Sequence, residues 1–176
     1  VFYNDVVVPK ENLVGDMNHG FLYLMSALDY ERMYPLAVYE AFFEQIVAYA
    51  KEKEINGVPL SKDPLIRQKL AQLKTELEVD KLLYYRLACM VDNDQIPNYE
   101  ASMQKLFATE TAQRITNTAM DLLGHRGLLK DGSRHAVLSG MAQWYYRTSV
   151  VETIYAGTSE IQRNIIALRG LKLPSK

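Results

Sequence analysis

The chain has 176 residues, of which 48% are hydrophobic and 23% charged, and its formal net charge at pH 7 is −1. These values are ordinary for a folded globular domain with a sizeable core, and they exclude a disordered segment. The near-neutral charge, without any run of five or more like charges, argues against nucleic acid or an anionic membrane as the main partner. No apolar stretch approaches the roughly 20 residues that a membrane span needs, and no basic-then-apolar signal pattern opens the chain.

Residues 1–9 are rich in β-branched and aromatic side chains and end in Pro9, a pattern that predicts a β-strand. A lone strand cannot satisfy its own backbone hydrogen bonds. We therefore interpret residues 1–15 as the end of a β-domain that is missing from the chain, and residues 16–176 as a separate helical domain. The absence of an initiator methionine before Val1 is consistent with an excised or processed piece.

Apolar residues recur at spacings of three and four over residues 18–53, which predicts one long helix. Pro35 falls inside it and should kink it, because proline cannot donate a backbone hydrogen bond. Asn56-Gly57 then breaks the pattern. Asp63 is placed to cap a second long helix that begins at Pro64 and ends near residue 93.

The rest of the chain predicts further helices, with glycines and a loop between them. They are a third helix over residues 99–123 that ends at Gly124 and Gly127, a loop over residues 128–139 with a turn at Asp131-Gly132, a fourth helix over residues 141–155, a hinge at Gly157 and a fifth helix over residues 159–169. Four to five long helices with short loops predict an all-α fold, an antiparallel helical bundle. Two apolar stripes are broad enough to indicate a second buried face, and hence an oligomer.

Several kinds of chemistry find little support in the residues. The three histidines lie far apart and no paired Glu-x-x-His motif occurs, so we predict no metal site. Neither a nucleophile elbow nor a phosphate-binding Gly-x-x-x-x-Gly-Lys loop is present. Cys89, the single cysteine, lies in an apolar helical stretch, which favours a buried, unreactive thiol in a reducing compartment.

Two stretches remain as candidates for a site. Around Gly157, a cap at Thr158 or Ser159 and a carboxylate at Glu160 predict a helix start, and by themselves describe only a glycine hinge between helices. Glu31 and Arg32 are neighbours that point in different directions, so they can simply be two solvated side chains. Pro35 lies within one turn of Glu31, and a kink so close to an acidic residue instead favours a functional site, because a surface helix without a function does not need one.

A family resemblance joins these two stretches. Residues 154–163, Ile-Tyr-Ala-Gly-Thr-Ser-Glu-Ile-Gln-Arg, resemble the C-terminal signature of the acyl-CoA dehydrogenases, in which a Glu, the usual catalytic base, stands where this chain has Ala156. Residues 24–32 resemble the first helix of the family's C-terminal domain. In a branch that includes isovaleryl-CoA and long-chain enzymes, the base is a Glu immediately before the Arg of that helix. The resemblance thus implies Glu31 as the base and Arg32 as a residue that orders the same part of the pocket.

The resemblance also implies a function. It is the α,β-dehydrogenation of an acyl-CoA thioester to a trans-2-enoyl-CoA with FAD as hydride acceptor, in a longer protein of which this fragment alone is inactive. The backbone N–H of Ala156 would polarise the thioester carbonyl, with Tyr155 and Gly157 beside the substrate. Residues 1–15 would be the exit from the family's middle β-domain. The implied setting is a homo-oligomer (a dimer of dimers) or a heteromer that passes electrons to an electron-transferring flavoprotein, in a bacterial or archaeal cytoplasm or a mitochondrial matrix.

For the cofactor, the resemblance implies a set of FAD-binding residues: Lys53, Gly124, Gly127, Thr158, Glu160 and Gln162. The chain departs from the family where Lys53 and Asn56 replace an Arg and a Phe, which removes a bidentate fork and an aromatic contact. Two rival interpretations stay open. One is a non-catalytic helical subunit that serves oligomerisation or contributes part of an FAD site to a partner, with Ala156 marking lost chemistry. The other is a bare bundle without a ligand.

Overall fold

The computed structural model describes residues 1–34 and 36–174. The described residues form α-helices, one two-stranded hairpin and short 3₁₀ and π turns, so the all-α prediction is confirmed. The helices are α1 (Gly20–Glu31), α2 (Ala37–Glu52), α3 (Pro64–Asp92), α4 (Tyr99–Leu123), α5 (Met141–Glu152) and α6 (Ser159–Ile165), and the strands are β1 (Glu54–Ile55) and β2 (Val58–Pro59). No helix in residues 1–34 and 36–174 combines the length and apolar character needed to cross a bilayer.

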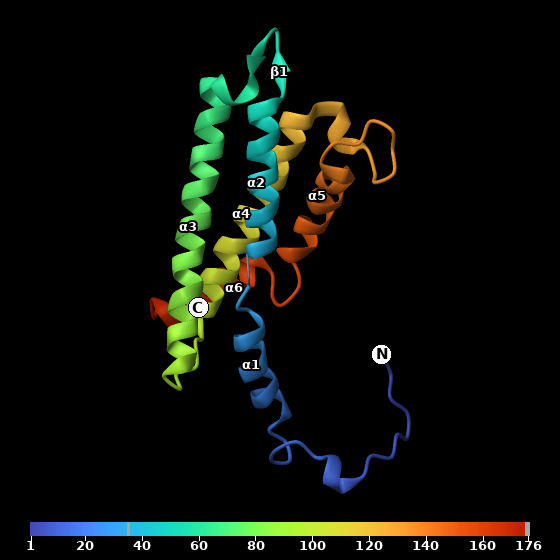
Figure 1. Cartoon of the computed structure of the whole chain (residues 1–176). Coiled ribbons are helices and arrows are strands. Elements are labelled where there is room, and N and C mark those ends of the chain that lie inside the picture. The colour runs from blue at the N-terminus through green and yellow to red at the C-terminus, as the bar shows by residue number, and fades with distance from the viewer. Residues whose placement is uncertain (35, 175–176) are drawn as a thin grey trace.

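Helices α2 to α5 stand side by side, and consecutive helices run in opposite directions (Figure 1). Helix α4 is central, because it packs against α3, α5 and α6. Helix α1 projects from one end of the bundle, and residues 1–19 curve away from it as an arm (Figure 1). This is the predicted antiparallel bundle, with α6 and the loop before it at the end from which α1 projects.

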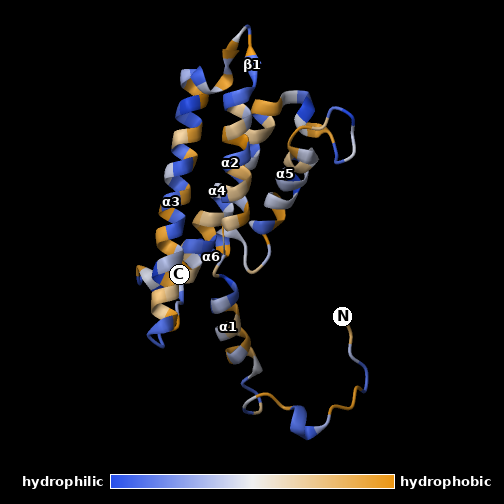
Figure 2. Cartoon of the chain, in the orientation of Figure 1, coloured by the Kyte–Doolittle hydropathy of each residue, from blue (hydrophilic) through white to orange (hydrophobic). Residues whose placement is uncertain are grey.

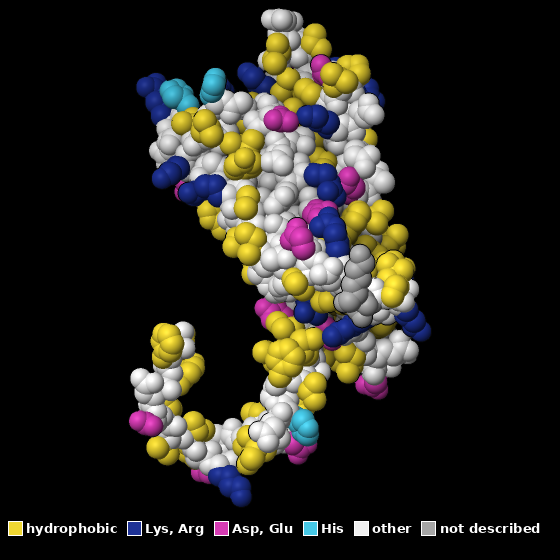
Figure 3. All heavy atoms as spheres, turned by 180° about the vertical axis from the view of Figure 1, so that it is seen from behind, with side chains coloured by type: hydrophobic (Ala, Val, Ile, Leu, Met, Phe, Trp, Pro, Cys, Tyr) yellow, Lys and Arg dark blue, Asp and Glu magenta, His cyan; other side chains and the backbone are white. Residues whose placement is uncertain are grey.

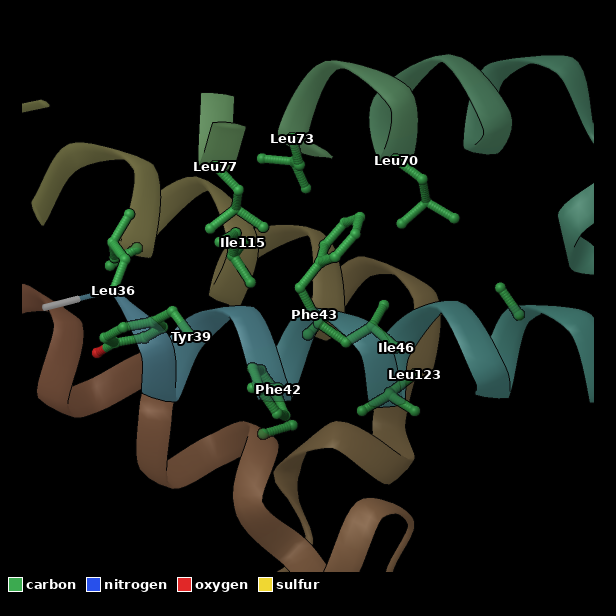
Figure 4. Packing of buried hydrophobic residues seen from close by; sticks show 14 of the residues in the cluster. Leu36, Tyr39, Phe42, Phe43, Ile46, Leu70, Leu73, Leu77, Ile115 and Leu123 are labelled. Atoms are coloured by element: carbon green, nitrogen blue, oxygen red, sulfur yellow. The ribbon is translucent and has the colours of Figure 1, made fainter. Parts of the chain in front are cut away.

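The core lies between α2, α3, α4 and α5. Phe42 of α2 points toward α5, where its ring centroid lies 4.5 Å from that of Tyr145, and Phe43 points to the other side, toward the leucines of α3 (Figure 4). Helix α4 contributes mainly small buried side chains, namely Ala101, Ala108, Ala112 and Ala119. Small side chains let neighbouring helices approach closely, which explains how α4 can pack against α2, α3, α5 and α6 at once.

The start of α3 is the predicted one. The Asp63 carboxylate accepts hydrogen bonds from the backbone N–H groups of Leu65 and Ile66 at 2.8 and 3.1 Å, and Pro64 occupies the first helical position. The break before it is a hairpin that the sequence analysis did not identify. Asn56 and Gly57 both have positive φ, 53° and 74°, which is the conformation that a tight two-residue hairpin turn requires.

The single helix predicted over residues 18–53 is wrong, since the chain forms α1 and α2 instead. After α1, the N–H of Met33 donates to the carbonyl of Tyr30. This hydrogen bond spans three residues instead of four, as in a 3₁₀-helix, and such a tighter turn commonly ends an α-helix. A new helix then starts after Leu36. Pro35, to which the kink was assigned, lies outside the described residues.

Residues 1–9, expected to be the last strand of a β-domain outside this chain, are exposed and unpaired here, because an extended segment without a neighbouring strand has nothing to pair with. Apolar residues nevertheless line this arm and α1 (Figures 2 and 3); Phe2 is 95% exposed and Phe21 72%. The expectation that Cys89 is buried is wrong. It is exposed as well, because α3 turns its other face, with Leu73, Leu77 and Leu87, toward the bundle.

Candidate functional site

The centre of the site is the turn between α5 and α6. Ala156 and Gly157 both have positive φ, 52° and 96°. A Cβ atom added to Gly157 would lie 2.6 Å from Nε2 of Gln162, so the position requires glycine both for its conformation and for its close approach. Thr158 then caps α6 by accepting a hydrogen bond from the N–H of Ile161 at 3.3 Å.

The carbonyl groups of this turn face the inside of the bundle. Nε2 of Gln162 donates to the carbonyl oxygens of Ala156 and Gly157, both at 3.0 Å. Nε of Arg32 lies 3.4 Å from the Ala156 oxygen, and Nζ of Lys105 donates to the Gly157 oxygen at 2.9 Å. The N–H of Ala156 finds no acceptor among the described residues. The carbonyls of the turn are therefore held by the side chains of Arg32, Lys105 and Gln162.

Arg32 is not a solvated side chain. It is 4% exposed, and its Nη1 forms an ion pair with Oδ1 of Asp29 at 2.7 Å. The other Asp29 oxygen accepts a hydrogen bond from Asn98 at 2.8 Å. Asp29 and Arg32 stand three residues apart on one helical face, and this spacing is the sequence signal for the pair that the analysis missed.

Glu31, by contrast, is exposed at the last residue of α1. Its carboxylate nevertheless acts on Tyr155. Partial burial and then the Glu152 carboxylate raise the pKa of Tyr155, and Glu31 adds a smaller effect in the same direction. The structure thus brings Glu31, Arg32 and the residues around Ala156 to one end of the bundle.

A buried carboxylate that the sequence analysis did not identify lies under this turn. Glu152, the last residue of α5, accepts a hydrogen bond from the Tyr39 hydroxyl at 2.7 Å. Burial, followed by that hydrogen bond, raises the pKa of Tyr39 well above its usual value, and burial followed by the interaction with Glu152 does the same for Tyr34. Both tyrosines therefore stay protonated, which suits them to donate hydrogen bonds.

The predicted cofactor residues separate into different places. Lys53 and Gly124 line a pocket of about 380 Å³ at the far end of α4, together with His125 and Arg126. Gly124 is exposed with φ 53°, and nothing lies within 4 Å of the position its Cβ would take. Lys53, His125 and Arg126 around an open glycine could pair with the diphosphate of FAD. Asp121, which also lines the pocket, is paired with Lys69.

Thr158 and Glu160 line a second pocket, of about 490 Å³, beside α4. Gln113 in this pocket and Leu123 in the first are about 15 Å apart along α4 at 1.5 Å per residue. The backbone N–H of Glu160 itself, and then the Thr158 hydroxyl, lower the pKa of the Glu160 carboxyl, which therefore remains anionic. Gly127 and Gln162 are buried and line neither pocket.

Comparison with known proteins identifies the family. The model of the acyl-CoA dehydrogenase C-terminal domain matches residues 18–171. The mitochondrial short-chain specific acyl-CoA dehydrogenase of Bos taurus is 36% identical over 176 residues, which are 98% of this chain and 41% of the bovine protein.

Two solved structures agree. Butyryl-CoA dehydrogenase from Megasphaera elsdenii has a TM-score of 0.84 at 29% identity, over 96% of this chain and 43% of that one. The ChsE4-ChsE5 complex from Mycobacterium tuberculosis gives 0.86 at 30% identity, over 99% of this chain and 45% of that one. The chain thus spans less than half the length of these relatives. It belongs to the acyl-CoA dehydrogenase family and corresponds to the family's C-terminal helical domain.

Proposed function

We propose that this domain works in a longer flavoprotein that dehydrogenates an acyl-CoA thioester at its α and β carbons, giving the trans-2-enoyl-CoA. The observation that carries the proposal is the Ala156 turn, whose carbonyls are held inside while the Ala156 N–H is left without an acceptor in the described part of the chain. This N–H would donate to the thioester carbonyl and stabilise the negative charge that develops on its oxygen. Tyr155 and Gly157 flank that donor on the substrate side.

Glu31 is the proposed base. It would remove the α-proton of the thioester, and FAD bound in the longer protein would supply the acceptor for the β-hydrogen that leaves as hydride. Glu31 lies at the end of α1, where its charge acts on Tyr155. Its carboxylate would therefore approach the substrate from α1, and not from position 156 of the turn. Arg32 would hold this end of α1 against the turn, because it joins Asp29 to the Ala156 carbonyl.

For the cofactor, we propose that Lys53 and Gly124 bind the diphosphate region and that Thr158 and Glu160 meet another part of FAD. The basic pocket around Lys53 and the separate pocket at Thr158 support this division. Gln162 would act indirectly by holding the turn, and Gly127 by close packing, since a Cβ there would lie 3.1 Å from Sδ of Met120.

The whole protein is proposed to contain a middle β-domain that ends in residues 1–15, followed by the helical domain of residues 16–176. The arm and α1 expose many apolar side chains, which supports the proposal that another part of the longer protein packs on them. We also propose an oligomer of several subunits and an electron-transferring flavoprotein as acceptor. Exposed apolar residues on the outer face of α3, such as Leu65 and Leu82, support the oligomer.

The test is Glu31→Gln in the full-length protein, assayed with short, long, branched and aromatic acyl-CoAs and a dye acceptor. Loss of the general base should lower kcat by about 10²- to 10⁴-fold while flavin absorbance is retained. Glu78→Gln is the matched control, because Glu78 pairs with Lys74 on the far surface of α3 and should keep full activity. Full activity of the Glu31→Gln variant would contradict the assignment of the base.

A second candidate, a non-catalytic subunit, is favoured by one observation: Ala156 stands where the family usually has its base. Such a subunit would bind flavin but dehydrogenate none of these thioesters, whether or not Glu31 is changed. Copurification of a second, different polypeptide that restores turnover would establish this alternative. Ala156→Glu separates the two further, because it restores the usual base only if a substrate site is present.

A further inference from the structure

Lys105 of α4 is a buried cation that the proposed mechanism does not use. Its side chain is 1% exposed, and it forms no ion pair with the described residues. Burial, and then the nearby charge of Arg32, lower its pKa, while Glu152 acts in the opposite direction. Burying an ammonium group is costly unless its hydrogen bonds compensate, so the position needs a physical reason.

The contacts of Lys105 lie on both sides of Ala156. Nζ donates to the carbonyl oxygen of Gly157 at 2.9 Å, and it lies 5.8 Å from the centre of the Tyr155 ring, within the range of a cation–π interaction. Both contacts join α4, the central helix, to residues next to Ala156. Lys105 thereby ties the turn to the most buried element of the bundle.

The contacts of Lys105 restrain the chain on both sides of the Ala156 N–H, at the Tyr155 ring before it and at the Gly157 carbonyl after it. In a trans peptide the C=O and N–H of one peptide group point in opposite directions, so the held carbonyls of Ala156 and Gly157 set the directions of the N–H groups of Gly157 and Thr158 and fix the backbone next to Ala156. Gln162 holds the carbonyls of Ala156 and Gly157, and Lys105 supplies the second donor to Gly157. With both lone pairs of that oxygen engaged, the positive φ angles of the turn are fixed from two elements, α4 and α6.

We propose that Lys105 is a positioning residue, which fixes the backbone of the turn around Ala156, and with it the place of the Ala156 N–H, by holding the Gly157 carbonyl and the Tyr155 ring. This inference rests on the proposed use of that N–H in polarising a thioester. Lys105 does not touch the substrate. Its removal is expected to affect the chemical step rather than the binding of the acyl chain.

The experiment compares Lys105→Met, which keeps the length of the side chain but no donor, with wild type in the full-length protein. The first readout is amide hydrogen exchange at Ser159, whose N–H donates across the turn to Thr153 at 3.1 Å. A hydrogen bond to a charged group is worth enough that its loss should speed this exchange by at least about tenfold. Exchange at Ile46, in the core of α2, should stay unchanged.

The second readout is steady-state kinetics with the best acyl-CoA. A misdirected donor should lower kcat about 10- to 10²-fold and leave KM within about threefold. Lys74→Met is the control, because Lys74 is a surface lysine paired with Glu40, Glu44 and Glu78 and should leave both readouts unchanged.

Unchanged exchange at Ser159 overturns the proposal, and so does faster exchange that extends equally to Ile46, because that result would mean general destabilisation. A rise in KM with constant kcat also overturns it. If Lys105→Met does not fold, Lys105→Gln is measured by the same criteria, since it lacks the charge but keeps a polar side chain. Failure of the proposed function is a different result: wild type then turns over no acyl-CoA, while exchange at Ser159 still tests Lys105.

Discussion

Asp80 of α3 shows how one buried carboxylate supports the site from a distance. It is 1% exposed and accepts a hydrogen bond at 3.0 Å from Nε2 of Gln104, whose amide also pairs with both the N–H and the carbonyl of Tyr34, at 2.8 and 2.6 Å. The Gln104 amide thus binds both backbone hydrogen-bonding groups of Tyr34, in the segment between α1 and α2. Burial raises the pKa of Asp80 to about 7, although the Gln104 hydrogen bond acts in the opposite direction.

This pKa predicts a pH-dependent effect of Asp80→Asn. The folded chain holds the Asp80 proton up to a pKa of about 7, whereas the unfolded chain releases it near 3.8. The stabilising contribution of the protonated form is therefore complete below the unfolded pKa and is lost as the pH rises through about 7. The variant should be more stable than wild type at pH 8, by up to about 4 kcal/mol at roughly 1.4 kcal/mol per pH unit, and should gain less at pH 5.

Urea denaturation at both pH values measures this difference. Asp121→Asn is the control, because Asp121 forms an exposed pair with Lys69 and should change stability equally at pH 5 and pH 8. An Asp80→Asn effect that does not grow between the two pH values would show that burial does not govern this carboxyl.

The site residues differ in how clearly the sequence indicated their role. Gly157 was identified from its type alone, and its positive φ confirms the reason. Arg32 was identified by resemblance, but its burial against Asp29 was not, because two residues of opposite charge three apart are also common on solvated helices. Lys105 left no signal, since only its place on the central helix distinguishes it from other lysines.

At the scale of elements, helix limits followed from residues with strong local preferences. The limits predicted for α3 and α4 agree with the structure because Asp63 caps α3 with its side chain, while Pro64 and Gly124 act through their own backbone conformation. The first helix was predicted wrongly, because an apolar repeat of three and four continues across the gap between α1 and α2. Periodicity reports which faces can be buried, and it does not report whether the backbone is continuous.

The cap of α3 provides a prediction at this scale. Asp63→Ala removes the acceptor for two backbone N–H groups and should lower the free energy of unfolding by about 1 kcal/mol. Asp63→Asn keeps an oxygen acceptor and should cost only a few tenths of a kcal/mol. Urea denaturation distinguishes the two. An equal loss in both variants would point to charge, and not to capping.

For the whole molecule, the bundle and the arm differ in how much they contribute to stability. The core joins α2, α3, α4 and α5, while residues 1–15 are exposed throughout. Deleting residues 1–15 from this chain should therefore change the free energy of unfolding by less than about 0.5 kcal/mol. Thermal unfolding followed by circular dichroism checks this. A large loss of stability would show that the arm packs on the bundle.

The same deletion has a matched comparison inside the core. Phe42→Ala removes a 1% exposed ring that packs on Tyr145 and should cost about 3 to 5 kcal/mol. The contrast between the two variants measures how far the helical domain of residues 16–176 is an independent unit.

By itself, the sequence determined the class of the fold, the limits of the middle helices, the glycine turn and, through resemblance, the family. Each of these depends on local backbone preference, on apolar periodicity or on a short motif, and all three are properties of neighbouring residues. Tertiary structure alone decided which side chains hold the Ala156 turn, because Arg32 directly follows α1, Lys105 lies in α4 and Gln162 lies in α6. It also separated the cofactor residues into two pockets along α4, since the distance between them is set by helix packing.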